Sequence, residues 1–443
     1  MTNSDRRQTS TDTFDAVIIG GGILGCSIAL ELTRRKKLNV CVVEKLREVG
    51  QGSTAWCCGI VRTHYSTEPG VTLGNESIRY WQNWADHLGA RDPLGLCEYR
   101  QVGGLYLMKP GWDIPKKIIS LMEQVGVLHE VLTPEQLRKT YPFLDLSKMS
   151  PVRRPDDPAF FECDSETTVE GGIFETESGY VPDPALSVHN IAHAAMTRGV
   201  TIRTRVTAVG ILRRGDRVRG VRLESGDVIE APIVVNAAGP HSSFVNRMAG
   251  VEIPLTVRPI RHEVSFIPAP PGFDLSKLPV LSDADSGSYC RPVPPNRILI
   301  GSEDPECDPH EYVDDADRVH DEPSGAQFDA QVMRLMKRIP ALRKGPADGF
   351  GALYDTTTDD WYPIFDRSDL DGFYLAMGTS GGWFKGGAPI GYLMADLIDR
   401  VENGQDHDED PVRVRLPYSG REIDLSFFSR NRAPHRTSMS VTG

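Results

Sequence analysis

Asp15-Ala-Val-Ile-Ile-Gly20-Gly-Gly22-Ile-Leu-Gly25 is the stretch that decides the fold. An apolar strand runs directly into Gly20, Gly22 and Gly25, which match the pattern G-x-G-x-x-G at the start of a helix. The next strand ends in Glu44, about 20 residues after the last glycine, where a Rossmann unit carries the acid that binds a ribose. Glycines also occur in ordinary turns, but strand, glycines, helix, strand and acid in this order predict a dinucleotide-binding β-α-β unit.

The size and composition of the chain are those of a globular protein. Its 443 residues are enough for two or three domains. The net charge of −12 argues against a nucleic-acid partner, because such a partner needs a basic surface to neutralise its phosphates. No apolar run approaches the length of a membrane span.

The eight cysteines predict neither a disulfide framework nor a metal site. None forms a C-x-x-C pair, and no histidine–cysteine cluster has zinc spacing. Cys26 and Cys41 fall in the Rossmann helix and strand, where buried free thiols are usual. We therefore predict no metal and a reduced, cytoplasmic protein, and leave open a redox role for the adjacent Cys57 and Cys58.

Segments typical of nucleotide-binding units occur at the start, middle and end of the chain, with strand-rich segments between them. In the middle, Ile233-Val-Val-Asn-Ala-Ala-Gly239 has the pattern of a buried parallel strand that ends in small residues. This layout predicts two interleaved, discontinuous domains, one of Rossmann-type α/β structure and one α+β domain built on an antiparallel sheet. The predicted boundaries are 14–80, 181–250 and 348–415 for the dinucleotide-binding domain, 81–180 and 251–347 for the substrate-binding domain, 1–13 for a disordered tail and 416–443 for a loose tail.

Four separated motifs resemble those of one protein family. They are the Rossmann opening, Gly52-Ser53-Thr54 with Arg62, the Val-Val-Asn-Ala-Ala-Gly-Pro strand, and the loop Thr379-Ser-Gly-Gly-Trp-Phe-Lys385. Together they make the chain similar to the D-amino-acid-oxidase-like FAD-dependent oxidoreductases. The pattern is nearest to the group of sarcosine oxidase, glycine oxidase and dimethylglycine dehydrogenase, and it runs from about Phe14 to Gly404.

The resemblance implies FAD as the cofactor and matches residues to it one by one. Gly20, Gly22 and Gly25 would hold the pyrophosphate, and Glu44 the adenosine ribose. The further positions that match cofactor contacts are Lys45, Ser53, Thr54, Val206, Ala238 and Gly239. A helix cap is an equal alternative for the hydroxyls of Ser53 and Thr54.

The last loop is expected to serve the flavin itself. Gly381, Gly382 and the backbone as far as Gly386 precede a helix, so their N–H groups should face an anionic partner. In a flavin site that partner is the N1–C2=O edge, which gains negative charge when hydride arrives at N5.

Two cations are expected to bind the substrate. By the resemblance, Arg62 matches the arginine that grips the substrate carboxylate in monomeric sarcosine oxidase, and Lys385 the lysine that shares this task and lies beside the cofactor. An arginine fork binds a carboxylate bidentately, and a lysine adds a point charge. Tyr354 matches a pocket tyrosine. The alternatives are a surface salt bridge for Arg62, a solvated loop lysine for Lys385 and a core aromatic for Tyr354.

Several positions depart from the family pattern. Trp56 and Ala352 stand near positions where relatives carry flavin-linking side chains, so FAD is expected to be noncovalent. Leu299 stands near the oxygen-activating lysine, which admits an electron acceptor other than O₂. His64 and His262 are candidate pocket histidines.

The acid Glu303 near the substrate region has two readings. It either pairs with a substrate ammonium or belongs to the acidic loop 303–322, which is the reading that the sequence favours.

The resulting hypothesis is oxidation of a carboxylate-bearing secondary or tertiary amine, such as an N-methyl amino acid, by hydride transfer to flavin N5. The resulting imine is then hydrolysed. Substrate and O₂ or another acceptor are the expected small-molecule partners, with a homo- or hetero-oligomer possible. The alternatives are a 2-hydroxy-acid dehydrogenase that uses His64 or His262 as base, and a non-catalytic flavoprotein subunit or assembly factor.

Overall fold

The computed structural model describes residues 10–162, 164–317 and 322–435. Its centre is a six-stranded sheet with the strand order β12-β3-β2-β16-β24-β23, in which all neighbours but the last pair are parallel. The strands are β2 (Ala16–Ile19), β3 (Val40–Glu44), β12 (Thr201–Thr204), β16 (Ile233–Asn236), β23 (Ile364–Arg367) and β24 (Phe373–Met377). A parallel sheet assembled from distant segments of the chain confirms the predicted Rossmann-type unit.

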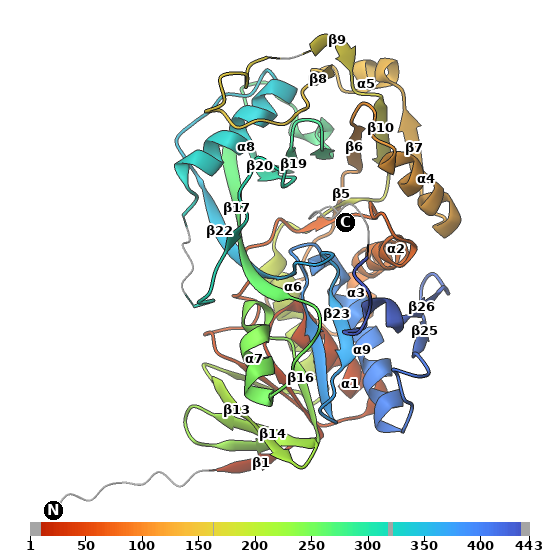
Figure 1. Cartoon of the computed structure of the whole chain (residues 1–443), viewed down its shortest axis with the longest axis vertical. Helices are drawn as coiled ribbons and strands as arrows, with labels where there is room; N and C mark the ends of the chain where they lie inside the picture. Colours follow the sequence, from red (N-terminus) through yellow and green to blue (C-terminus); the bar gives the residue numbers. More distant parts are fainter. Residues whose placement is uncertain (1–9, 163, 318–321, 436–443) are drawn as a thin grey trace, which may run out of the picture.

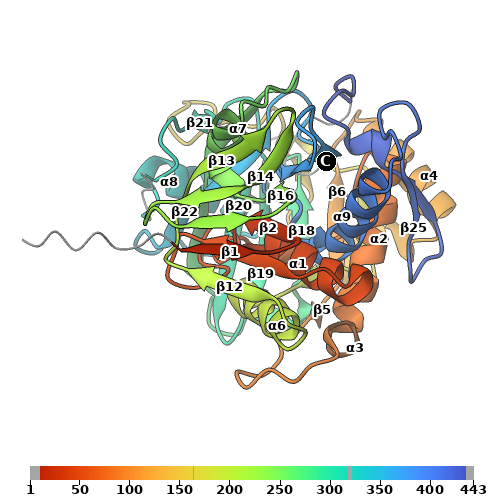
Figure 2. The same ribbon diagram turned by 90° about the horizontal axis from the view of Figure 1, so that it is seen from below.

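Both faces of this sheet are buried, which explains why its strands are continuously apolar. Ala16 and Ile18 face α1 (Ile23–Lys36) and α9 (Gly387–Glu402), whereas Val17 and Ile19 face the opposite side. There they pack with a four-stranded sheet, which lies at the lower end of the molecule in Figure 1 and faces the viewer in Figure 2. That sheet contains, in order, β1 (Thr11–Thr13), β15 (Val228–Glu230), β14 (Arg217–Leu223) and β13 (Ala208–Arg214).

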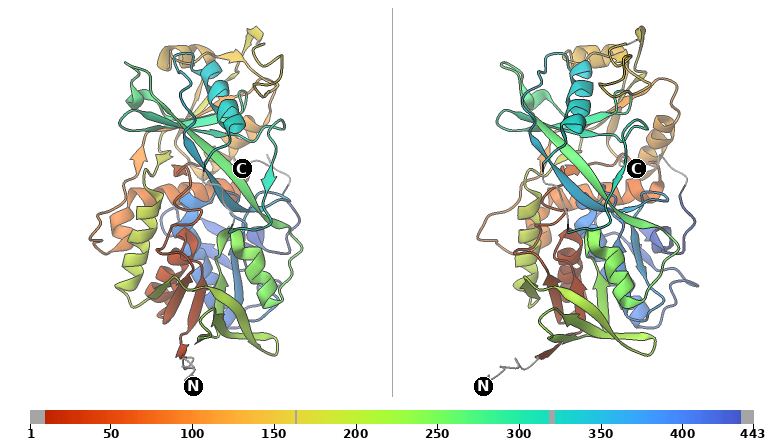
Figure 3. Two further views of the ribbon diagram at one scale, coloured as in Figure 1. Left: turned by 90° about the vertical axis from the view of Figure 1, so that its left-hand side faces the viewer. Right: turned by 60° about the vertical axis from the view of Figure 1, so that its left-hand side comes forward.

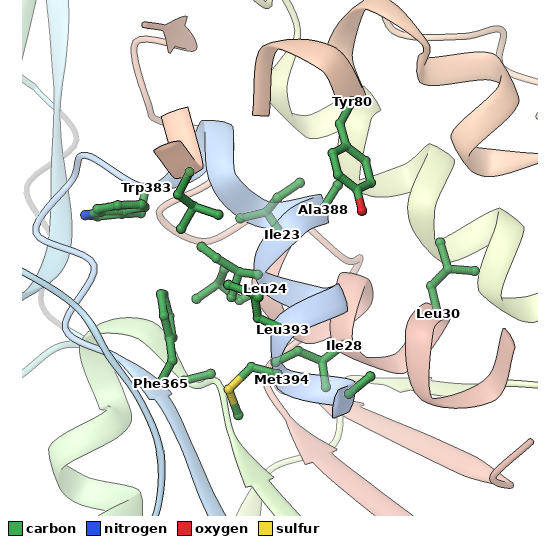
Figure 4. Close-up of a cluster of buried hydrophobic side chains, with 14 of the residues drawn as sticks. Ile23, Leu24, Ile28, Leu30, Tyr80, Phe365, Trp383, Ala388, Leu393 and Met394 are labelled. Atoms are coloured by element: carbon green, nitrogen blue, oxygen red, sulfur yellow. The ribbon is translucent and has the colours of Figure 1, made fainter. Parts of the chain in front are cut away.

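Helices α1 and α9 form the centre of the main core (Figure 4). Leu24 and Ile28 of α1 meet Leu393 and Met394 of α9, and Phe365 of β23 closes the cluster. This contact places the N-termini of the two helices, one from each end of the chain, at the same edge of the sheet.

A second, nine-stranded sheet forms the upper part of the molecule (Figure 1). It is antiparallel except where β18 pairs with β6, and α8 (Gly325–Arg338) covers a core on one face. This confirms the predicted antiparallel-sheet domain. Its strands are β6 (Gly104–Met108), β7 (His129–Leu132), β10 (Gly171–Glu175), β17 (Val257–Pro268), β18 (Val280–Asp283), β19 (Ser288–Val293), β20 (Arg297–Ser302), β21 (Glu311–Tyr312) and β22 (Gly349–Thr357).

The long strands β17 and β22 run side by side from the upper sheet toward the lower part of the molecule (Figure 3). Their ladder joins Val257–Ser265 to Gly349–Thr357. The boundary predicted at residue 348 would assign β22 to the dinucleotide-binding domain, whereas the structure hydrogen-bonds β22 into the nine-stranded sheet. The alternation of apolar and polar residues along a strand does not reveal which sheet that strand joins, so the sequence could not assign β22.

The remaining elements connect or cover the two main sheets. The helices are α2 (Glu68–Gln82), α3 (Trp84–Leu88), α4 (Ile114–Val125), α5 (Pro134–Thr140), α6 (Pro184–Met196) and α7 (Ser242–Ala249), with 3-10 turns η1 (Gly239–His241), η2 (Leu275–Lys277), η3 (Phe384–Gly386) and η4 (Leu425–Phe428). The short strands are β4 (Ile60–Val61), β5 (Arg100–Gln101), β8 (Ser147–Lys148), β9 (Asp164–Thr168), β11 (Gly179–Tyr180), β25 (Arg413–Arg415) and β26 (Glu422–Asp424).

Both predicted tails contain ordered structure, which corrects the sequence-based expectation. Thr11–Thr13 form β1 and pair with β15, and residues 1–9 lie outside the described part of the chain. At the other end, Leu425 and Phe428 are buried in the main core. The polar composition of 416–443 concealed these few apolar anchors; residues 436–443 lie outside the described part.

Two further expectations concern membrane and cysteine chemistry. Within the described residues, no helix has the length and apolar character needed to cross a bilayer. All seven cysteines of the described part are free thiols, and Cys163 lies outside it.

The buried ion pair between Arg430 and Asp366 fastens the C-terminal segment. Arg430 Nη1 lies 3.0 Å from Asp366 Oδ2, and the aspartate side chain is fully buried. We expect Arg430→Met to lower the free energy of unfolding by about 3 kcal/mol, because it leaves a buried carboxylate without its cation.

Chemical denaturation of the purified protein measures this change. Arg413→Met is the matched control, since Arg413 is 59% exposed where it pairs with Asp424, and it should leave the free energy of unfolding nearly unchanged. Equal effects of the two substitutions would contradict a fastening role for the buried pair.

Candidate active site

A cavity of about 640 Å³ opens at the carboxyl ends of β2, β3 and β16. Ile19, Val43 and Ala237, which end or follow these strands, all line it, together with the N-terminus of α1. The crevice beyond the carboxyl ends of parallel strands is where open α/β sheets bind their ligands. The volume lies within the usual range for a small-molecule site.

The glycine-rich turn brings three backbones together at this edge. Gly20 has φ +111°, and a Cβ there would lie 2.2 Å from the carbonyl oxygen of Ala237. A Cβ on Gly25 would lie 1.9 Å from the oxygen of Gly20. Gly22 is the N-cap of α1 and offers no side-chain cap, so this helix end faces the cavity with backbone N–H groups.

Glu44 is positioned at the cavity wall by two backbone hydrogen bonds. Its Oε2 accepts from the N–H of Gly21 at 2.7 Å, and its Oε1 from the N–H of Leu46 at 2.8 Å. The carboxylate therefore has a fixed orientation beside the glycine turn and lines the cavity. A carboxylate at this place can accept hydrogen bonds from ribose hydroxyls.

Six other predicted cofactor positions line the same cavity, whereas Gly25 does not line it and Gly382 and Lys385 line only the smaller pocket described below. The six are Lys45, Ser53, Thr54, Val206, Ala238 and Gly239. The hydroxyl of Thr54 accepts from the N–H of Ile23 at 3.3 Å, so it caps α1 as well as facing the cavity. The hydroxyl of Ser53 instead donates to the carbonyl oxygen of Leu353, and Lys45 pairs with Asp317.

A smaller pocket of about 80 Å³ adjoins the large cavity. The two share Cys57, Tyr354, Gly381 and Phe384 in their walls. The segment 57–62 and the last loop form one side of the pocket, and strands of the nine-stranded sheet form the other. The pocket therefore lies between the two main sheets and opens onto the large cavity.

Arg62 and Lys385 lie together in this pocket although they are far apart in the sequence. Both are buried and both lie over the ring of Tyr65, with the Arg62 Cζ at 4.5 Å and the Lys385 Nζ at 5.1 Å from its centroid. Burial and the neighbouring charge of Arg62 hold the pKa of Lys385 well below its usual range. Such a pair of cations favours an anionic ligand, which would offset their mutual repulsion.

Tyr354 and His262 also line the pocket, and their rings make an edge contact with centroids 5.9 Å apart. The hydroxyl of Tyr354 donates to the carbonyl oxygen of Trp56 at 2.9 Å. Burial lowers the pKa of His262 to about 4, so its imidazole is neutral at pH 7. The Nε2 of His262 has no hydrogen-bond partner within the described residues.

His64 is not among the residues that line either cavity. Its ring stacks on Tyr106 with centroids 3.9 Å apart, and its Nδ1 lies 3.5 Å from the carboxylate of Glu175. Burial lowers its pKa. His64 therefore supports the wall from behind Tyr106, unlike the four other predicted substrate-side residues.

The carboxylate of Asp355 holds the start of the last loop in place. The Asp355 carboxylate accepts from the N–H of Gly378 at 2.6 Å and from the Thr379 hydroxyl at 2.8 Å. Gly381, with φ +71°, then turns the chain so that it lines both cavities.

Two N–H groups of this loop do not face the cavity as predicted. The N–H of Gly382 donates to Thr379, and that of Gly386 donates to Trp383. The loop forms a tight turn and a 3-10 turn before α9, so these two donors are used internally and do not face a ligand.

Sequence reasoning missed several pocket residues. Tyr106, Ser282 and Tyr289 come from strands of the nine-stranded sheet and line the pocket. Glu303 also lines it and is buried: it begins the acidic loop, as expected, and its side chain still lies in the pocket wall. The signal in the sequence was its place one residue after an apolar strand, which keeps it at the sheet.

Comparison with known proteins shows one family. The model of the family described as FAD dependent oxidoreductase matches residues 15–397. The sarcosine oxidase subunit beta of Arthrobacter sp. is 25% identical over 393 residues, covering 88% of each chain. The human mitochondrial sarcosine dehydrogenase is 26% identical over 388 residues, which cover 85% of this chain and 38% of that protein. The crystal structure of L-proline dehydrogenase from P. horikoshii superposes with a TM-score of 0.75 at 22% identity, covering 95% of this chain and 97% of that one.

The large cavity fits FAD, the cofactor of this family. The close approach at Gly20 leaves room for backbone but for no side chain. The N-terminus of α1, where Thr54 bonds only the N–H of Ile23, suits a pyrophosphate, and Glu44 suits a ribose. The end of the cavity shared with the small pocket lies at Tyr354 and Gly381. These residues would hold FAD with its reactive ring toward the pocket that contains Arg62 and Lys385.

The close approach at Gly20 gives a test of the cofactor site. We expect Gly20→Ala to lower stability by about 1–3 kcal/mol and to abolish FAD retention, because its Cβ would clash with Ala237 at a strained φ. The flavin-to-protein absorbance ratio after gel filtration and the Tm of the apoprotein measure both effects.

Gly325→Ala is the matched control, because Gly325 lines neither cavity. A Cβ on Gly325 would have no neighbour within 4 Å, so FAD content and Tm should stay unchanged. A Gly20→Ala protein with normal FAD content would contradict the role of the Gly20 turn in binding FAD.

The mode of FAD attachment has its own test. Of the residues near possible attachment points, Trp56 and Ala352 carry no nucleophile, and burial raises the pKa of the Cys57 thiol so that it stays protonated. We expect acid denaturation to release all FAD into the supernatant and to leave a colourless pellet. A pellet that stays yellow would show a covalent link.

Proposed function

The chain belongs to the FAD dependent oxidoreductase family, and we propose that it oxidises a carboxylate-bearing secondary or tertiary amine such as an N-methyl amino acid. It is an FAD-dependent amino acid or amine oxidoreductase, as are the relatives that it resembles. The proposal adds the substrate class to this activity. The relatives named for sarcosine, which are 25% and 26% identical to this chain, support the N-methyl preference.

The observation that carries the proposal is the pair of buried cations in a small pocket beside the cofactor cavity. Arg62 and Lys385 converge from segments 57–62 and 384–386, and the pocket of about 80 Å³ admits only a small ligand. A planar guanidinium binds a carboxylate with two hydrogen bonds, and the lysine adds a third donor. A small amino acid anchored there would present its carbon atoms to the large cavity.

The chemical roles follow from this arrangement. FAD, when bound, accepts the two electrons and the hydrogen removed from the substrate carbon next to nitrogen. Arg62 and Lys385 fix the carboxylate and thereby the position of that carbon. Tyr106, Tyr289 and Phe384 line the pocket and limit access of water to the reacting atoms.

A 2-hydroxy acid is the second candidate substrate, and one observation favours it. His262 lines the pocket as a neutral imidazole, and its Nε2 has no hydrogen-bond partner within the described residues. It could therefore accept the hydroxyl proton that such a reaction releases. Its pKa of about 4 makes it a weak base, so this candidate ranks second.

The two candidates differ in which ligand reduces the flavin. Anaerobic mixing of the purified holoenzyme with sarcosine, dimethylglycine, proline and matched 2-hydroxy acids reports flavin reduction as loss of visible absorbance. Reduction by N-methyl amino acids is the expected result, and reduction by hydroxy acids alone would overturn the proposal. The rate of recovery in air then separates an oxidase from a dehydrogenase; no lysine stands at Leu299 to favour O₂.

Substitution of Arg62 tests the carboxylate site. We expect Arg62→Ala to lower kcat/KM for an N-methyl amino acid about 100-fold, because the charged hydrogen bonds to the carboxylate are lost. Arg62→Lys should recover part of the loss, since it restores charge without the planar fork.

Arg297→Ala is the matched control, because Arg297 pairs with Asp348 on the exposed surface of the molecule. It should leave kcat/KM unchanged. An unchanged kcat/KM in Arg62→Ala would contradict the proposal that Arg62 binds the substrate carboxylate.

A further inference from the structure

Glu303 is a buried acid in the wall of the substrate pocket. It follows β20 directly, is 8% exposed, and lines the pocket with Arg62 and Lys385. Its N–H donates to the carbonyl oxygen of Gly287 at 3.1 Å, and its Oε1 accepts from the hydroxyl of Ser282 at 2.7 Å. Backbone and side chain are therefore both held in place.

Three neighbouring buried acids are paired with arginines, which Glu303 is not within the described residues. Asp283 pairs with Arg338 at 2.6 Å, Asp308 pairs with Arg334 at 2.7 Å, and Glu263 pairs with Arg261. Glu303 is held instead by a neutral hydroxyl, which leaves its charge available to a ligand. An acid placed in this way in a substrate pocket suits recognition of a cation.

The positive and the negative side chains of the pocket come from different elements and lie on different walls. Arg62 and Lys385 come from the loops beside the cofactor cavity and share the ring of Tyr65. Glu303 comes from the opposite wall, where it lies with Ser282 of β18. A ligand that carries a carboxylate and an ammonium group matches this separation of charge.

The protonation of Glu303 is set by several groups that face it. Burial raises its pKa to about 7, while Ser282 and Arg62 act to lower it, and Asp304 and Asp283 act to raise it. Tyr106 and Tyr289 also face it, and burial raises the pKa of each well above the usual range, so both are neutral. Burial also raises the pKa of the next residue, Asp304, to about 7, but Asp304 does not line this pocket. Glu303 is thus the acid of the pocket lining that exchanges a proton near neutral pH.

We propose that Glu303 binds the ammonium group of the substrate and takes its proton, so that the pocket selects carboxylates that carry a basic amine. The N–H bond of the ammonium breaks, the proton moves to a Glu303 carboxylate oxygen, and the electron pair stays on nitrogen. This free pair is what oxidation of the adjacent carbon requires. The inference rests on the proposed function and gives it a second specificity residue.

Glu303→Gln in the holoenzyme tests the inference with two probes. Sarcosine carries the amine, and (methylthio)acetate replaces that amine with sulfur. We expect kcat/KM for sarcosine at neutral pH to fall at least about tenfold, because the proton acceptor is lost. The Kd of (methylthio)acetate, read from the change in flavin absorbance, should change less than about threefold, since Arg62 still holds its carboxylate.

The pH dependence of kcat/KM separates a proton acceptor from a residue that only supports the structure, because only the loss of a proton acceptor would change it. In the unchanged enzyme, kcat/KM for sarcosine should rise with pH through about 7, where Glu303 loses its proton. In Glu303→Gln that limb should disappear, and the rate should rise instead toward the pKa of the free amine, about 10 as for other alkylammonium groups. Glu303→Asp, which keeps the carboxylate, should keep the limb near neutrality.

Glu306→Gln is the matched control, because Glu306 is exposed in the same loop, and it should change none of these quantities. Equal weakening of both probes, or tighter (methylthio)acetate with unchanged sarcosine kinetics, would overturn the inference and make Glu303 a counter-ion of Arg62. Failure of every amine to reduce the flavin of the unchanged enzyme would overturn the proposed function and this inference with it.

Discussion

The fold depends on the close approach of three backbone segments at the glycine turn. The chain leaves β2 at Gly20, passes against Ala237 after β16, and enters α1 at a distance that only Gly25 permits. Because α1 then packs on α9, the same contact brings the last loop of the chain to the edge where the first strand ends. The cofactor cavity and the substrate pocket are both products of this convergence.

The pocket stores electrostatic free energy that a ligand can release. Arg62 and Lys385 are buried beside each other, and burial, together with the charge of Arg62, lowers the pKa of Lys385. Across the pocket, burial shifts the pKa of Glu303 in the opposite direction, toward the neutral acid. A zwitterion satisfies both walls at once, which neither a plain acid nor a plain amine does. Binding of the substrate and the charge states of these three side chains therefore depend on each other.

The features that the sequence predicts well are local. Gly20, Gly25 and Glu44 follow from spacing along one β-α-β unit, and the structure places all three as expected. Arg62 and Lys385 are distant in sequence, and only a resemblance to a family brought them together before the structure did.

The features that the sequence misses depend on contacts across the fold. Tyr106 faces the pocket because β6 takes a particular place in a nine-stranded sheet, which no local pattern encodes. For Glu303 the sequence left two readings open, and the place of β20 in that sheet puts its side chain in the pocket. The N–H of Gly382 was misassigned because the turn at Thr379 competes for it. Arg430 was placed in a loose tail because its partner, Asp366, lies on another strand.

The continuous ladder between β17 and β22 has a consequence for the timing of catalysis. These strands run from the upper sheet toward the lower part of the molecule, so a hinge motion that opened the pocket would have to shear their hydrogen bonds (Figure 3). Exchange of substrate and product is then left to loops and side chains around the pocket, which move in nanoseconds to microseconds rather than on the slower scale of domain opening. We therefore expect these local motions, rather than a movement of the two main sheets against each other, to pace turnover.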